Sequence, residues 1–297
     1  FEKALQNVNR SSNFDLTRVY LTYKDKLNRD IGMRITLDGE RITGVAATRQ
    51  NLFNFLKYAY FEMPAPIPDE MKIIPMDLAF KVGLQHTLWI DWADSFWENR
   101  YIAKVLVDNE GVMSSADFGV AAVGKVSFSD LPALEYHTTL MNGAGFRSAE
   151  TNSSKNIGLR VNSKVYNDKA VGSVSVGGFA HVANALTGND STTQGGILVG
   201  YKHPSSGHGY AEYLYGTGIS GYSLAAQYQI LPELGLIARM DSHDPNRSTA
   251  NNEIARLIYG ASLDWGKNLK LALDIQNKTT GSGATESTLF VHNMVSF

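Results

Sequence analysis

The stretch Leu269-Lys270-Leu271-Ala272-Leu273-Asp274-Ile275-Gln276 alternates apolar and mainly polar side chains from end to end. Successive side chains of a β-strand point to opposite faces, so this segment has one fully apolar face and one mainly polar face. The alternation therefore predicts a strand that separates an apolar environment from a polar one.

The same period of two recurs along the whole chain, whereas helical periodicity is weak. Clear members are residues 31–38, 76–85, 157–165, 222–230, 234–241 and 257–265. Weaker members are residues 14–24, 52–63, 118–126, 134–142, 171–182, 197–202, 210–215 and 289–297. Together they predict about fifteen strands, as expected of a large all-β chain.

Composition excludes several classes of protein. The 297 residues contain no cysteine, which excludes disulfides, thiolate metal sites and a cysteine nucleophile. A formal charge of −2 and a pI near 6.4 argue against a nucleic-acid-binding protein. The mean hydropathy of −0.18, with no apolar run of about 18 residues, excludes a helical membrane protein. A membrane β-barrel stays open, because its strands are apolar only at alternate positions.

The connections between the predicted strands tend to alternate in length. Short ones are residues 25–30, 166–169, 231–233 and 266–268, and long, polar ones are residues 143–155, 184–194, 242–252 and 279–288. Residues 64–75 are an exception, a long connection where the alternation requires a short one. Short turns at one end and long loops at the other are typical of outer-membrane barrels.

Alternation alone does not distinguish a membrane barrel from a soluble sandwich or barrel. The polar faces are rich in Gly, Ala, Ser and Gln, whereas a solvated sheet more often carries dense Lys and Glu. Aromatic residues lie on the apolar face near strand ends, at Tyr58, Tyr60, Tyr222, Tyr228 and Trp265. We therefore expect residues 1–297 to form a single transmembrane antiparallel β-barrel, with a soluble binding barrel as the alternative.

The chain ends bear on the number of strands. Residues 289–297 keep the strand pattern up to the terminal Phe297, which predicts a closing strand or, alternatively, an ordinary edge strand. Residues 1–10 show no secretory signal. Because bacterial barrels have even strand numbers, we expect about sixteen strands, with the first strand largely missing from this numbering and residues 1–12 forming its top and loop.

Several stretches of the first half carry a family resemblance. They are residues 14–23 with 34–38, residues 56–60, 83–90 and 97–101, and residues 117–120, 124–125 and 141–145. On these stretches and Phe297, the sequence resembles bacterial porins of the phosphate-selective porin O/P-like group. The resemblance implies a channel in the outer membrane of a Gram-negative bacterium.

Residues 89–115 are too long for an ordinary loop. Trp97, Tyr101 and Val105 have helical spacing within them. We expect the segment to fold into the lumen and narrow the pore, with its basic residues opposite its acidic ones: Arg100, Lys104, Asp91, Asp94 and Glu98. The alternatives are an external loop capped by its own aromatic residues, or another strand.

The polar faces provide the candidate charges of the lumen. The basic ones are Arg34, Lys81, Lys125, Arg160, Lys164, Lys202, Arg239 and Lys270, and the acidic ones are Asp38, Asp77, Glu135, Glu212, Asp241, Asp264 and Asp274. Rings of one sign select ions, but here the signs nearly cancel, which predicts weak selectivity with a slight preference for anions if the basic side chains cluster. Each charge could instead be a solvated wall residue paired across strands.

No catalytic or metal-binding motif stands out. His86, His137 and His181 lack the spacing of metal ligands, so we expect neither an enzyme nor a cofactor. The function predicted is a porin that lets small hydrophilic solutes or ions diffuse through a water-filled barrel. The alternative is a structural or adhesive barrel that acts through its loops or a partner protein.

The expected partners are the lipid bilayer and small solutes or ions, and not nucleic acid. A homotrimer or another outer-membrane partner is a further expectation. Residues 171–182 are the candidate subunit contact, because Gly177, Gly178 and Ala180 would let backbones approach closely.

Overall fold

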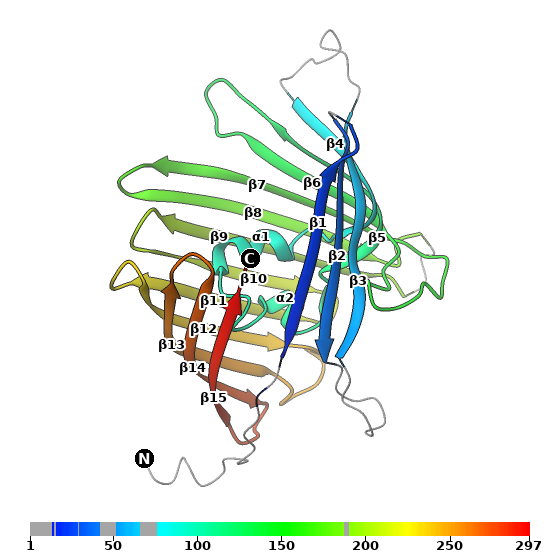
Figure 1. Cartoon of the computed structure of the whole chain (residues 1–297). Coiled ribbons are helices and arrows are strands. Elements are labelled where there is room, and N and C mark those ends of the chain that lie inside the picture. Colours follow the sequence, from blue (N-terminus) through cyan, green and yellow to red (C-terminus); the bar gives the residue numbers. More distant parts are fainter. Residues whose placement is uncertain (1–13, 15, 29, 42–51, 66–75, 187–189) are drawn as a thin grey trace, which may run out of the picture.

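A computed structural model describes residues 14, 16–28, 30–41, 52–65, 76–186 and 190–297 of the chain (Figure 1). Fifteen strands form one sheet in which each strand pairs with its neighbours in sequence. The strands are β1 Arg18–Lys26, β2 Gly32–Arg41, β3 Leu52–Pro64, β4 Met76–His86, β5 Ala116–Val126, β6 Leu134–Met141, β7 Asn156–Asp168, β8 Gly172–Ala183, β9 Thr192–His203, β10 Gly207–Gly216, β11 Ser220–Gln229, β12 Leu234–Asp244, β13 Ile254–Trp265, β14 Leu269–Thr280 and β15 Glu286–Val295. Every predicted segment coincides with one strand, so the predicted all-β fold is confirmed.

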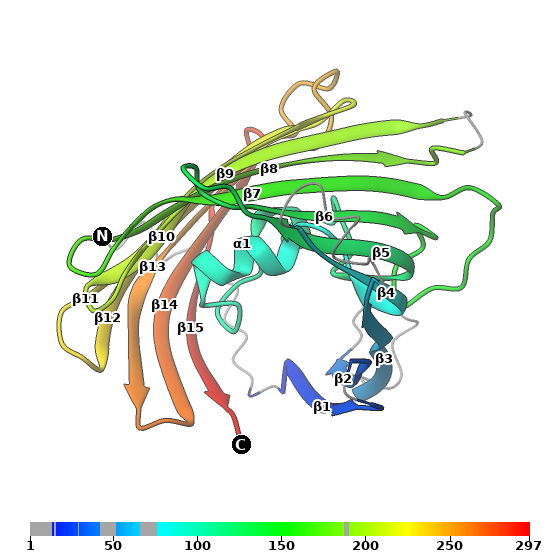
Figure 2. The same ribbon diagram turned by 90° about the horizontal axis from the view of Figure 1, so that it is seen from above.

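The sheet curves into a barrel-shaped wall. Figure 2 shows this wall seen from above, with β1 and β15 at its two ends and α1 (Ile90–Trp97) inside the curve. Within the described residues, no pairing joins β15 to β1. The strand expected over residues 1–12 lies outside the described part of the chain.

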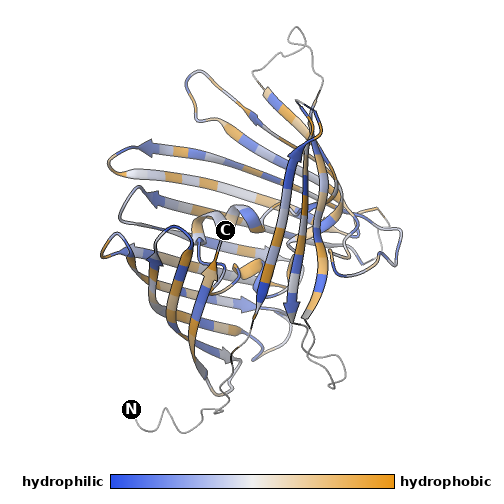
Figure 3. Ribbon diagram, viewed as in Figure 1, coloured by the Kyte–Doolittle hydropathy of each residue, from blue (hydrophilic) through white to orange (hydrophobic). Residues whose placement is uncertain are grey.

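The two faces of the wall are inverted relative to a soluble protein. Leu273 on β14 is 53% exposed, whereas the adjacent Asp274 is only 1% exposed. The same contrast repeats on β12, where Met240 is exposed and both Arg239 and Asp241 are buried. Figure 3 shows the resulting alternation of hydropathy along the strands. Apolar side chains cover the outside, and polar side chains face the inside.

The connections follow the predicted alternation of length. Three-residue turns join β7 to β8, β9 to β10 and β13 to β14. At the opposite end, residues 142–155 and 245–253 are long connections, and residues 87–115 separate β4 from β5. The connection of β10 to β11 is short although it lies at the long-loop end. Among the described residues, no helix is long and apolar enough to cross a membrane.

A β-bulge alters the alternation on β3. Thr36 pairs with Tyr58 and Leu37 pairs with Leu56, which leaves Lys57 as an extra residue. Lys57 and Tyr58 are consecutive in sequence, yet both are buried, because a bulge re-aims side chains locally. Tyr58 packs on His86 and Tyr60 lies near the same ring, both on the inner side. The prediction that Tyr58 and Tyr60 belong to the outer aromatic belt is therefore wrong.

Candidate functional site

The segment between β4 and β5 lies inside the curve of the sheet (Figure 2). Its first part is α1, whose Ile90, Ala93, Phe96 and Trp97 are buried. The helix ends because Glu98 adopts a left-handed conformation with φ of 56°. The chain then turns, and a short helix, α2, follows at Leu106–Asn109. The helical spacing read through Trp97, Tyr101 and Val105 is therefore wrong beyond Trp97.

Glycines on the inner wall make room for the large side chains of this segment. A Cβ atom added at Gly158 would overlap Leu88, one at Gly177 would overlap Trp92, and one at Gly200 would overlap Phe96. These glycines lie on β7, β8 and β9 respectively. The glycines of these strands thus leave space for the side chains of the segment, and Trp92 packs against Gly177 from the inner side.

Apolar side chains on the inner wall continue this packing surface. Leu198, Leu214, Ile237 and Ile258 are almost fully buried in one cluster with Trp89, Phe96, Trp97 and Leu106 of the inner segment. They come from β9, β10, β12 and β13, on faces that are otherwise polar. Burial of such side chains contributes about 1.5–3 kcal/mol each, so the segment is held firmly.

Polar contacts fix the main chain of the segment in the same place. Arg160 Nη1 donates to the carbonyl oxygen of Leu88 over 2.7 Å, and Arg239 Nη1 donates to that of Lys104 over 2.7 Å. Trp89 Nε1 donates to Glu212 Oε1 over 2.5 Å. Hydrogen bonds to charged groups are the stronger ones, so these contacts set the position of the segment against the wall.

The segment presents its charges as a small network. Arg100 binds Asp94 over 2.5 Å and also pairs with Asp108. Burial raises the pKa of Asp94 to about 6, against the opposing effect of Arg100, and the neighbouring carboxylates Asp91 and Asp108 raise it further. Glu98 does not pair with Arg100 and instead forms an ion pair with Lys202 on β9 over 2.5 Å.

The wall opposite carries further basic residues. Arg18 on β1 binds Asp38 over 2.9 Å and Glu40 over 2.6 Å. Lys57 donates to the Tyr20 hydroxyl over 2.9 Å, and Tyr20 in turn interacts with Arg100 of the inner segment. Arg147, from the connection between β6 and β7, pairs with Glu40. We call Arg18, Lys57, Arg100, Lys104 and Arg147 the basic cluster.

The structure brings some of the predicted lumen residues to the segment. Arg34 contacts His86, which pairs with Asp91, and Arg160 and Arg239 bind the main chain of the segment. Lys81 pairs with Glu62 on β3 over 3.3 Å. Lys270 pairs with Asp264 over 3.6 Å and lies within electrostatic range of Glu98.

Two other predicted lumen residues lie away from the inner segment. Lys125 and Lys164 are exposed near the short-turn ends of β5 and β7. Four charged residues of this region were not predicted from the sequence as lumen charges: Arg18, Lys57, Arg147 and Asp108. Arg18 shares a face with Tyr20 and could have been found by alternation, but Lys57 depends on the bulge.

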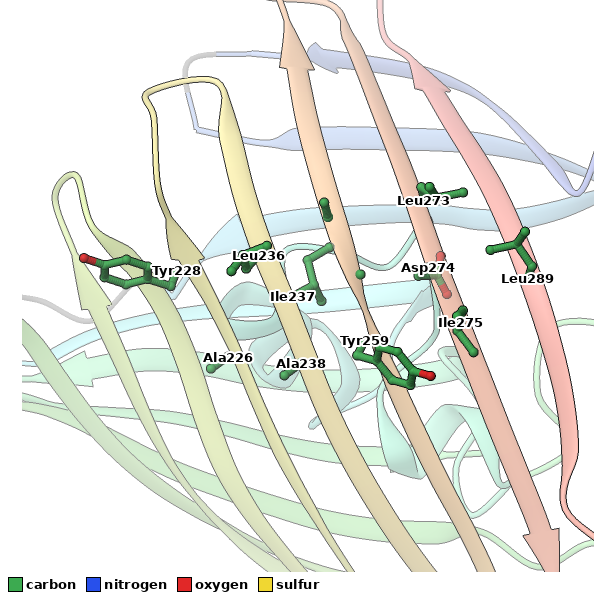
Figure 4. Close-up of a pocket in the computed structure, with 12 residues that line it drawn as sticks. Ala226, Tyr228, Leu236, Ile237, Ala238, Tyr259, Leu273, Asp274, Ile275 and Leu289 are labelled. Carbon is green, nitrogen blue, oxygen red and sulfur yellow. The ribbon is translucent and has the colours of Figure 1, made fainter. Parts of the chain in front are cut away.

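A groove on the outer face of the wall is lined mainly by apolar side chains. It has a volume of about 630 Å³ and crosses β11 to β15, with Tyr228, Leu236, Tyr259, Leu273 and Leu289 among its lining residues (Figure 4). These side chains belong to the exposed apolar face and not to the lumen. Among the described residues, no cluster of His, Asp and Glu could hold a metal ion.

No family model matches the sequence, and no curated protein matches it. Solved structures do match the fold. A Salmonella typhi OmpF in complex with daunomycin aligns with a TM-score of 0.65 and 11% identity over 97% of this chain and 93% of that one. The Acinetobacter baumannii outer-membrane channel DcaP aligns at 0.55 and 14% over 95% and 85%. A triple mutant of the Rhodopseudomonas blastica porin aligns at 0.55 and 11% over 93% and 89%. The chain thus has the fold of bacterial porins.

Proposed function

We propose that the protein is a porin of the outer membrane of a Gram-negative bacterium, which lets small hydrophilic solutes or ions diffuse passively. One observation carries the proposal: residues 89–115 are held against the inner wall of a sheet whose outside is apolar and whose inside is charged. An apolar outer face suits contact with lipid, and a polar inner face suits a water-filled channel. The porin fold supports the same conclusion.

The pore is narrowest, in this proposal, between the inner segment and the wall formed by β1 to β3. Arg100 is 25% exposed and its partner Asp108 only 10%. Arg147 is 41% exposed and its partner Glu40 only 12%. In both pairs the cation is more exposed than its carboxylate partner, which favours anions even though the charges nearly balance.

We propose further that the resemblance to the phosphate-selective porin O/P-like group reflects this anion preference. The basic cluster supports the idea, and competition between phosphate and chloride in current recordings tests whether phosphate itself is preferred. We also propose a homotrimer in which residues 171–182 form one subunit contact, although Gly177 packs against Trp92 of the inner segment.

A structural or adhesive barrel is the second candidate. The apolar cluster under the inner segment favours it, because this cluster fills part of the interior. Such a barrel would act through its outer loops or a partner protein, with little channel activity.

Liposome swelling distinguishes the two candidates. The protein is purified in detergent, reconstituted into liposomes, and exposed to sugars of increasing size. A porin gives swelling rates that fall as the sugar grows, and liposomes without protein serve as the control. Rates equal to this control for every sugar would reject the channel and leave the structural barrel.

A further inference from the structure

We infer that the basic cluster, together with the rings of Tyr20 and Phe146, forms a binding subsite for aromatic carboxylates on the path through the channel. The inference rests on the proposed function and adds a substrate class to it. It is carried by the convergence of cations and aromatic rings at one place on the inner wall.

The cations come from separate parts of the chain. Arg18 lies on β1, Lys57 on β3, Arg100 and Lys104 on the inner segment, and Arg147 on the connection between β6 and β7. Burial lowers the pKa of Lys104; Asp108 opposes this effect, and Arg18, Arg100 and Arg147 lower the pKa further. These basic groups therefore lie within electrostatic range of one another.

The carboxylates that pair with these cations are less exposed than the cations themselves. Asp38 is fully buried, and it is shared by Arg18 over 2.9 Å and by Lys57 over 3.7 Å. Lys104 is 37% exposed, whereas its partner Asp108 is 10% exposed. An anion entering from the lumen can thus reach guanidinium and ammonium groups without displacing these internal pairs. Arginine suits a carboxylate because its parallel N–H groups match the two oxygens.

Aromatic rings lie among the same cations. Tyr20 is 42% exposed as a residue, and its ring has Lys57 Nζ 4.7 Å and Arg18 Cζ 5.5 Å from its centroid. The Phe146 ring has Arg147 Cζ at 5.0 Å and Lys57 Nζ at 5.6 Å, and it meets Phe55 edge-on. A flat ring can therefore pack on the free part of Tyr20 while its carboxylate binds the arginines.

This combination separates aromatic carboxylates from other solutes. Acetate or chloride gains only the charge interaction, and an aromatic cation is repelled by the cluster. An aromatic pair adds enough attraction to tighten binding roughly 2- to 10-fold over a non-aromatic acid of the same size. The bulge at Lys57 is essential, since it places a cation between the two rings.

The experiment is block of chloride current through single channels of the whole protein. The probes are benzoate, cyclohexanecarboxylate as the matched non-aromatic acid, and acetate. We expect benzoate to block at roughly 2- to 10-fold lower concentration than cyclohexanecarboxylate. The Tyr20→Leu variant should lose this difference, Tyr20→Phe should keep it, and Tyr222→Leu on the outer face should behave as wild type.

Equal block by benzoate and cyclohexanecarboxylate in the wild type would overturn the inference while leaving the porin intact. A difference that persists in Tyr20→Leu would also overturn it, because the ring would then not be the partner. If the wild type gives no current, the proposed function fails instead. Saturation-transfer NMR of benzoate with the detergent-solubilised protein then tests the subsite separately, by the same comparison of acids and variants.

Discussion

Arg239 on β12 donates a hydrogen bond of 2.7 Å from Nη1 to the carbonyl oxygen of Lys104, while its Nε and Nη2 atoms bind the two oxygens of Asp241. One buried side chain thus connects the wall of the barrel to the segment inside it. Ser223 donates to the same carboxylate over 2.6 Å, and Arg256 lies 3.8 Å from it. The position of the inner segment is therefore coupled to the stability of the wall.

Replacing Arg239 with methionine should destabilise the folded protein. The change leaves the buried Asp241 without its main partner, which costs about 3–5 kcal/mol. Thermal unfolding in detergent, followed by the shift in mobility on SDS gels without boiling, measures the loss. Lys202→Met is the matched control, because the Lys202–Glu98 pair is exposed and should contribute no more than about 1 kcal/mol. An unchanged unfolding temperature for Arg239→Met would contradict this role of Arg239.

Gly200→Val should displace the inner segment. The added side chain would overlap the Phe96 ring, so α1 must move away from the wall. We expect altered single-channel conductance with larger fluctuations, because the apolar packing that holds the segment is lost. Gly178→Ala is the control, since a Cβ atom there meets its nearest neighbour at 3.3 Å, from the backbone of Gly196. Wild-type conductance in Gly200→Val would show that the segment does not set the pore.

Arg100→Gln should reduce the preference for anions. Arg100 is the member of the basic cluster that links the segment to Tyr20 of the wall, and its loss leaves Asp94 without its cation and Asp108 with Lys104 alone. The reversal potential in a salt gradient should shift toward cations. The same change at Lys164, which is exposed near a turn, should shift it little. Equal shifts for the two variants would argue against a localised constriction.

Acid pH should increase the preference for anions through Asp94. The pKa of this carboxyl is raised to about 6, so it is ionised at pH 7.5 and neutral at pH 5. Protonation removes one negative charge beside Arg100 and should shift the reversal potential toward anions as the pH falls through about 6. Because the folded pKa lies above the unfolded value of 3.8, this group also favours folding most at acid pH, and that contribution is lost as the pH rises through about 6.

Asp94→Asn provides the control for the pH dependence. The variant should behave at pH 7.5 as the wild type behaves at pH 5, with no further shift near pH 6. A wild-type shift that survives in Asp94→Asn would assign the titration to another group.

Alternation along the sequence is sufficient to predict the strands, because an apolar outer face and a polar inner face impose the period of two that separates Leu273 from Asp274. It was not sufficient at Lys57, where one extra residue reverses the phase and brings Tyr58 inside. For residues 89–115 the sequence predicts folding into the lumen but leaves an external loop or another strand as alternatives. The residues that mark its packing surface are Ile237 and Ile258 on otherwise polar faces, and Gly158, Gly177 and Gly200 beneath bulky side chains. They could not be recognised from the sequence, because they lie on strands that are distant in sequence and contact the segment only in the folded protein.

The most direct measurement is a planar-bilayer recording of the purified protein. A porin whose inner segment is fixed against the wall should insert in discrete conductance steps of one main size, with a reversal potential slightly on the anion side. Repeated insertion trials that yield no conductance steps from folded protein would contradict the channel itself.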